Sequence, residues 1–121
     1  MKKIILAVLI IAGFVHWYTK DPGAGGLQHA AAYDVVVAEI TSQHQEKVIL
    51  YATSWCGYCK KTRAFLESQN IPYHEYDIEK SDKGRQQYQK LRGNGVPLIV
   101  ANSEIIRGYS TSAIVNALAR K

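Results

Sequence analysis

Two cysteines, Cys56 and Cys59, are the only thiols in this chain of 121 residues, and two residues separate them. Any disulfide within the chain must therefore join these two neighbours, which suits redox chemistry better than stapling of the fold. A cysteine reacts as its thiolate, so it needs surroundings that stabilise negative charge. The pair follows a short β-prone run and opens a helix-like stretch, where unpaired backbone N–H groups and the helix dipole provide such surroundings. We expect Cys56 to attack a disulfide and Cys59, one helical turn further on, to close the internal disulfide.

A C-x-x-C pair can also be half of a zinc site. Such a site would need a second pair of ligands, but no second C-x-x-C motif is present. The four histidines form no H-x-x-x-H pair either; they are His16, His29, His44 and His74. We therefore favour the redox pair and predict no metal site.

The segments around the pair alternate between strand and helix patterns. We predict strands at residues 48–53 and 73–78, a helix from the cysteine pair to about Gln69, and a polar helix that Ser81 caps. Two short apolar runs, at residues 98–101 and 104–107, are separated by Asn102-Ser103, which is a hairpin signal. A last helix is predicted from about Ser110. This order indicates an α/β domain at residues 47–121.

Three sequence motifs lie along this domain. Residues 51–59 read YATSWCGYC, Val96-Pro97 follows, and Gly108-Tyr109 comes later. From Val48 to about Ala119 the chain resembles the glutaredoxin family of the thioredoxin superfamily. The resemblance implies a thioredoxin-like fold, with a four-stranded mixed sheet flanked by helices. It also implies a cis-proline at Pro97 that faces the cysteines.

The same resemblance implies a thiol–disulfide oxidoreductase that reduces or exchanges protein disulfides or glutathione mixed disulfides. No bound cofactor is implied, and glutathione is the implied co-substrate. By the resemblance, Val96 would pair its backbone with the cysteine of glutathione, and Gly108, Ser110 and the start of the last helix would hold the γ-glutamyl carboxylate. The implied groove is completed by Tyr58, Pro97 and Tyr109.

Several positions depart from the family pattern. Glutaredoxins often carry lysine at the position of Thr53, proline at Gly57, threonine at Gly95, and an acidic pair at Ser110-Thr111. Trp55-Cys56-Gly57 reads more like thioredoxin, which leaves a protein reductant as an alternative to glutathione. A small residue at Gly57 also occurs in glutaredoxins that hold an iron–sulfur cluster, so a cluster-binding module without redox turnover is the alternative function.

The N-terminal segment has the pattern of a signal anchor or signal peptide, which we assign to residues 1–20. Lys2-Lys3 precedes an unbroken apolar run over Ile4–Val15, and no clear cleavage site follows. The excess of positive charge on the N-terminal flank predicts that the domain lies outside, in the periplasm of a bacterium, anchored to the inner membrane or exported. The cytoplasmic face is the alternative. Residues 21–46 are assigned to a linker, with turn composition at 21–26, and an extra helix at about 30–42.

The charge distribution argues against a nucleic-acid partner. The formal net charge is +5, from 15 basic and 10 acidic residues. Basic residues in the body of the chain alternate with acidic ones instead of forming one stripe. We predict no nucleic acid, a membrane contact through the N-terminal helix, and a monomer.

Overall fold

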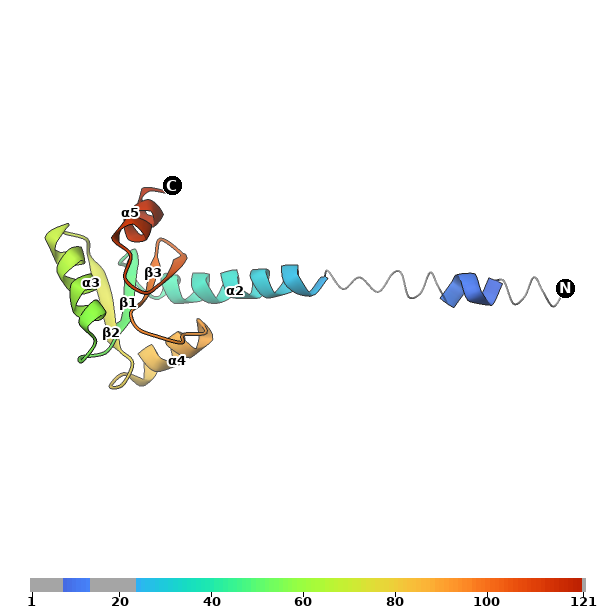
Figure 1. The fold of residues 1–121 in the computed structure, drawn as a ribbon, viewed down its shortest axis with the longest axis horizontal. Helices are drawn as coiled ribbons and strands as arrows, with labels where there is room; N and C mark the ends of the chain where they lie inside the picture. The colour runs from blue at the N-terminus through green and yellow to red at the C-terminus, as the bar shows by residue number, and fades with distance from the viewer. Residues whose placement is uncertain (1–7, 14–23, 121) are drawn as a thin grey trace. The chain divides into compact units, whose positions relative to one another are not determined.

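The computed structural model describes residues 8–13 and 24–120, and the chain divides into two units, Met1–Ala32 and Tyr33–Lys121 (Figure 1). In the first unit, residues 8–13 are helical. Most of the predicted anchor, residues 1–7 and 14–20, lies outside the described residues. Among the helices at residues 8–13 and 24–120, none is long and apolar enough to cross a membrane.

The extra helix, α2, spans Ala24–Ser42. This confirms a helix at residues 30–42, but α2 begins earlier, within the segment predicted as linker. Adding a residue to an existing helix costs far less than starting one, so the alanine-rich part can extend the helix back across Gly25 and Gly26. In the second unit, Val37 and Ile40 of α2 are buried.

Four strands form one mixed sheet, as the resemblance implied, and their order is β2-β1-β3-β4. β1 and β2 are parallel, while β3 pairs antiparallel with both β1 and β4. The bounds are β1 Val48–Ala52, β2 Tyr73–Asp77, β3 Leu98–Ala101 and β4 Glu104–Arg107. Asn102 and Ser103 join the last two strands with φ of 48° and 68°, the left-handed geometry that a tight hairpin requires.

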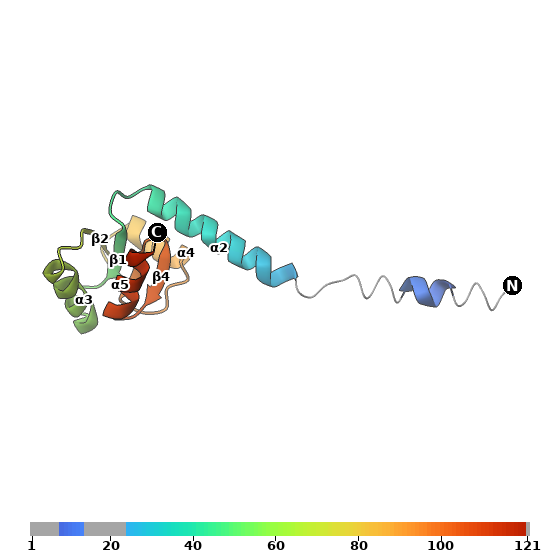
Figure 2. The same cartoon turned by 90° about the horizontal axis from the view of Figure 1, so that it is seen from above.

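Helices cover both faces of this sheet (Figure 2). α3 spans Gly57–Ser68, α4 spans Asp82–Lys90 and α5 spans Thr111–Ala119. Alternate residues of a strand point to opposite faces, and β1 follows this rule. Val48, Leu50 and Ala52 join a core with α3 and α5, while Ile49 and Tyr51 join a second core with α2 and Leu91, which follows α4. The central strand is thus buried on both sides, which fixes the position of the loop that follows it.

α4 approaches the sheet closely at Gly84. A Cβ atom built at Gly84 would lie 2.5 Å from the Cβ atom of Tyr76 in β2. The Tyr76 ring stacks at 5.7 Å on Tyr51 of β1, so it has little room to move. Glycine at this position therefore allows α4 to lie against the end of the sheet next to the cysteine loop.

We predict that Gly84→Ala destabilises the fold by about 1–3 kcal/mol, the usual cost of forcing extra volume into a packed interior. Gly57→Ala is the control, because a Cβ atom there meets nothing within 4 Å. Urea unfolding should place Gly57→Ala within about 0.5 kcal/mol of the native chain. Equal stability of the two variants would show that the close approach of α4 does not matter.

Candidate active site

Cys56 is the N-cap residue of α3, in the loop that leaves the buried strand β1. Its backbone is extended, with φ −79° and ψ 119°. The backbone N–H of Cys59 donates to Cys56 Sγ at 3.2 Å. The sulfur therefore takes the place of the oxygen in an ordinary side-chain cap, and it accepts one of the N–H groups that the first turn leaves unpaired. The sequence had predicted that Cys56 stands at the start of this helix.

Cys59 lies one turn into α3 and is fully buried, whereas Cys56 retains 8% exposure. Both are free thiols. Burial is the main cause that raises the pKa of Cys59 to about 12, and the hydrogen bond and charge of Cys56 raise it further. The Thr53 backbone and the Arg63 guanidinium act in the opposite direction. Cys59 therefore stays protonated at neutral pH.

The segment before β3 lies against the cysteine loop. The Cys56 thiol donates to the Val96 carbonyl oxygen, with a separation of 3.7 Å. The Val96–Pro97 peptide bond is cis, which confirms the prediction for Pro97. Gly108, at φ +83°, donates its N–H to the Pro97 carbonyl at 2.9 Å. Residues far apart in the sequence thus meet at one end of the sheet.

Two tyrosines form a rim on one side of Cys56. Tyr58 and Tyr109 stack with ring centroids 6.3 Å apart, and their side chains are 61% and 39% exposed. The ammonium of Lys61 lies 5.3 Å from the centre of the Tyr58 ring. Ser110 caps α5, because its Oγ accepts from the Ala113 N–H at 3.3 Å. All the predicted site residues therefore lie around the first turns of α3 and α5.

Three basic residues that follow the cysteine pair closely in the sequence take different positions. Arg63 donates to the Thr53 carbonyl at 3.1 Å and pairs with Glu75. Its guanidinium acts on the buried Cys59. Lys61 belongs to the tyrosine rim, and Lys60 is exposed.

An open groove of about 480 Å³ lies next to the cysteine loop, with Val96 in its lining. It forms because β1 and β2 are parallel, so that their carboxyl ends and the loops that follow meet at one edge of the sheet. Trp55 is 72% exposed there, and its indole N–H donates to the Glu79 carboxylate. The groove is lined by Thr53, Trp55, Ile78, Glu79, Tyr88, Gly95 and Val96.

Glu79 and Tyr88 were not among the residues selected from the sequence. Glu79 is the second residue after β2. Tyr88 lies in α4 and donates its hydroxyl to the Gly95 carbonyl at 3.0 Å. The available signal was positional: a charged residue just after a strand parallel to β1 must lie at the same edge as Cys56.

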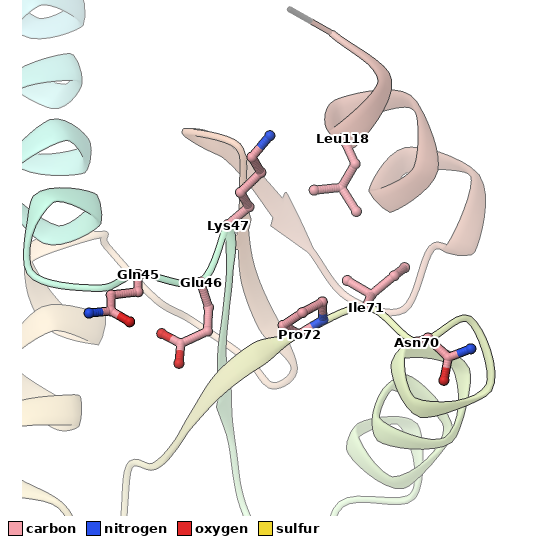
Figure 3. A pocket seen from close by; sticks show the side chains of 7 residues that line it. All are labelled: Gln45, Glu46, Lys47, Asn70, Ile71, Pro72 and Leu118. Atoms are coloured by element: carbon pink, nitrogen blue, oxygen red, sulfur yellow. The ribbon is translucent and has the colours of Figure 1, made fainter.

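A second hollow, of about 460 Å³, lies where β1 and β2 begin, at the ends of these strands that are away from the cysteine loop (Figure 3). Ile71, Pro72 and Leu118 supply its apolar wall, and Lys47 lies at its edge. Within residues 8–13 and 24–120, no three or more His, Cys, Asp or Glu side chains are placed to share a metal ion.

Comparison with known proteins assigns the family. The family model described as glutaredoxin matches residues 48–106. An uncharacterised glutaredoxin-like 8.6 kDa protein from Clostridium pasteurianum, in the rubredoxin operon, is 33% identical over 66 residues, which cover 54% of this chain and 88% of that protein. The chain belongs to the glutaredoxin family. Glutaredoxins are thiol–disulfide oxidoreductases, and the C-x-x-C pair at the start of α3 fits that activity.

Solved structures show the same fold. A glutaredoxin from Archaeoglobus fulgidus is similar with a TM-score of 0.56 and 21% identity, covering 67% of this chain and 95% of that one. A buckwheat glutaredoxin in complex with glutathione has a TM-score of 0.53 and 13% identity, covering 73% of this chain and 91% of that one. These similarities confirm the thioredoxin-like fold with its mixed sheet and flanking helices.

The raised pKa of Cys59 leads to a titration test. In Cys56→Ala the hydrogen bond and charge of Cys56 are gone, so the pKa of Cys59 should fall below about 12, while burial keeps it above the ordinary value. Ultraviolet thiolate absorbance against pH would measure it, with the upper step of the native dithiol as reference. A Cys59 pKa that is unchanged in Cys56→Ala would contradict the coupling of the two thiols.

Proposed function

We propose that this glutaredoxin exchanges disulfides through Cys56, which attacks, and Cys59, which resolves. The observation that carries the proposal is the asymmetry of the pair. The Cys56 sulfur caps α3 and contacts the carbonyl of Val96 in the groove wall, and Cys56 keeps 8% exposure, while Cys59 is fully buried one turn further into the helix. A substrate can therefore reach the first sulfur and not the second.

In the first step the Cys56 thiolate attacks one sulfur of a substrate disulfide. A disulfide between Cys56 and the substrate forms, and the other substrate sulfur leaves as a thiolate. Cys59 then loses its proton to that thiolate or to water and attacks Cys56 Sγ, which releases the second substrate thiol. The pair is oxidised to a disulfide, the substrate disulfide is reduced to dithiol, and an external thiol must later return the electrons.

The raised pKa of Cys59 supports this order of events. While Cys56 is a thiolate, its hydrogen bond and charge keep the Cys59 proton in place. Both influences disappear when Cys56 becomes a mixed disulfide. The pKa of Cys59 then falls at the step in which its thiolate is needed.

Glutathione mixed disulfides and protein disulfides are the proposed substrates, with glutathione or a dithiol protein as the reductant. The backbone of Val96, which contacts Cys56, would pair with the substrate next to its cysteine. Tyr58, Tyr109 and Gly108, together with the first turn of α5 that Ser110 caps, would line one side of the bound molecule.

Single-cysteine variants test the assignment. Cys56→Ser should lower turnover of a disulfide substrate by at least about 10³-fold, because the attacking sulfur is lost. Cys59→Ser should still complete the first step and accumulate a mixed disulfide, visible by mass spectrometry on the peptide that contains Cys56. Full turnover by Cys56→Ser in a dithiol-coupled assay would overturn the proposal.

We also propose that the N-terminal segment tethers this domain to a membrane, with the domain on the outer side. The support is the order of basic residues and apolar run, Lys2-Lys3 before Ile4–Val15. In a bacterium the domain would then act in the periplasm.

Reporter fusions after Lys121 test this orientation. A reporter that works only after export should be active, and one that works only in the cytoplasm should be silent. Replacing Lys2 and Lys3 with glutamate should lower the export signal severalfold, since the positive flank directs orientation. Activity of the cytoplasmic reporter alone would overturn the exported orientation.

A further inference from the structure

The groove beside Cys56 is directly connected to the reacting sulfur. Val96 lines the groove, and its carbonyl oxygen lies 3.7 Å from Cys56 Sγ. If the proposed function holds and a substrate cysteine becomes bonded to Cys56, the residue next to that cysteine must lie either here or on the tyrosine rim. The groove is therefore placed to read a side chain that neighbours the substrate cysteine.

The charge of the groove has one sign. Glu79 is the only charged residue among its lining residues. Among the described residues, Glu79 belongs to none of the ion pairs, and Lys80 next to it lies 4.0 Å from Asp77 instead. The Glu79 carboxylate accepts from the Trp55 indole N–H, which leaves it acceptor capacity for another donor.

Aromatic and polar surface surrounds this carboxylate. The Trp55 side chain is 72% exposed, and Tyr88 lines the same groove. Aromatic faces next to a carboxylate attract a cation in two ways, by ion pairing and by the cation–π interaction.

The Thr53 hydroxyl at the groove wall is buried and has no hydrogen-bond partner among the described residues. Buried hydroxyls normally have a partner, so the wall offers polar capacity that the fold leaves unused.

We infer that this groove is a specificity subsite for a lysine or arginine side chain next to the cysteine of a polypeptide disulfide, with Glu79 and Trp55 as the residues that recognise it. The inference rests on the proposed function and deepens it by naming the substrate class. Glutathione is a net anion at neutral pH. Glu79, the only charged residue that lines the groove, does not attract the carboxylates of glutathione. A basic polypeptide fits the site better.

A purely structural role for Glu79 is the competing explanation. In that case the carboxylate would only hold the Trp55 indole in place. Glu79→Gln separates the two roles, because the amide oxygen can still accept from the indole N–H while the charge is lost. Glu67→Gln is the matched control: Glu67 also accepts from an aromatic donor, Tyr73 Oη at 3.0 Å, but does not line the groove.

The experiment uses the full chain and short homodimeric peptide disulfides, so that attack on either sulfur bonds a peptide to Cys56. The peptides form two sets of three. In one set the residue before cysteine is lysine, alanine or glutamate, and in the other set the residue after cysteine is varied in the same way. Each kcat/KM is divided by the rate of that peptide with free dithiothreitol, which removes differences in intrinsic reactivity. The native protein should favour lysine over glutamate by roughly fivefold to tenfold on one side of the cysteine at low salt. High salt should reduce this ratio.

Glu79→Gln should bring the lysine-to-glutamate ratio close to one, and Glu67→Gln should keep the native ratio. Equal rates for the three peptides of each set in the native protein, a preference that survives in Glu79→Gln, or its equal loss in Glu67→Gln would overturn the inference. In those cases turnover of the alanine peptide leaves the proposed function standing. No turnover of any peptide would overturn both.

Discussion

The hydrogen bond from the Cys59 N–H to Cys56 Sγ is the contact on which the site depends, because it holds Cys56 at the start of the helix with slight exposure and Cys59 fully inside the core. It forms only if β1 ends at Ala52 and α3 begins at Gly57, which leaves Cys56 as the N-cap. Burial of β1 on both faces fixes the position of the strand and of its end at Ala52. The same turn that directs an N–H at the outer sulfur carries Cys59 inward, where burial raises its pKa. One local geometry therefore distinguishes the thiol proposed to attack from the thiol proposed to resolve.

The sequence predicted the features that depend on neighbouring residues. Ser81 caps the helix that it was expected to cap, the last helix begins close to Ser110 as expected, and Asn102-Ser103 forms the expected hairpin turn, because these signals act over a few residues. The cis bond before Pro97 was predicted through the resemblance to a family, since most X–Pro bonds are trans.

Features that depend on packing between distant segments could not be predicted in the same way. The contact of Trp55 with Glu79 joins the loop after β1 to the loop after β2, and composition says nothing about which residues meet there. Arg63 is close to both cysteines in the sequence, and its contacts with Glu75 and the Thr53 carbonyl place its charge where it acts on Cys59. The start of α2 at Ala24 also went against the local signal, because extension of a helix outweighed the cost of two glycines. The surroundings of the cysteine loop consequently include two surfaces of different chemistry, a tyrosine rim with Lys61 and an acidic groove.

The most direct test of the asymmetry is the rate at which each thiol of the reduced native protein is alkylated as pH rises, with the modified cysteine identified by peptide mass. The helix cap at Cys56 and the raised pKa of the buried Cys59 predict that Cys56 is modified first, and that Cys59 stays unmodified through neutral and mildly alkaline pH. Modification of Cys59 first, or of both thiols at equal rates, would contradict the account.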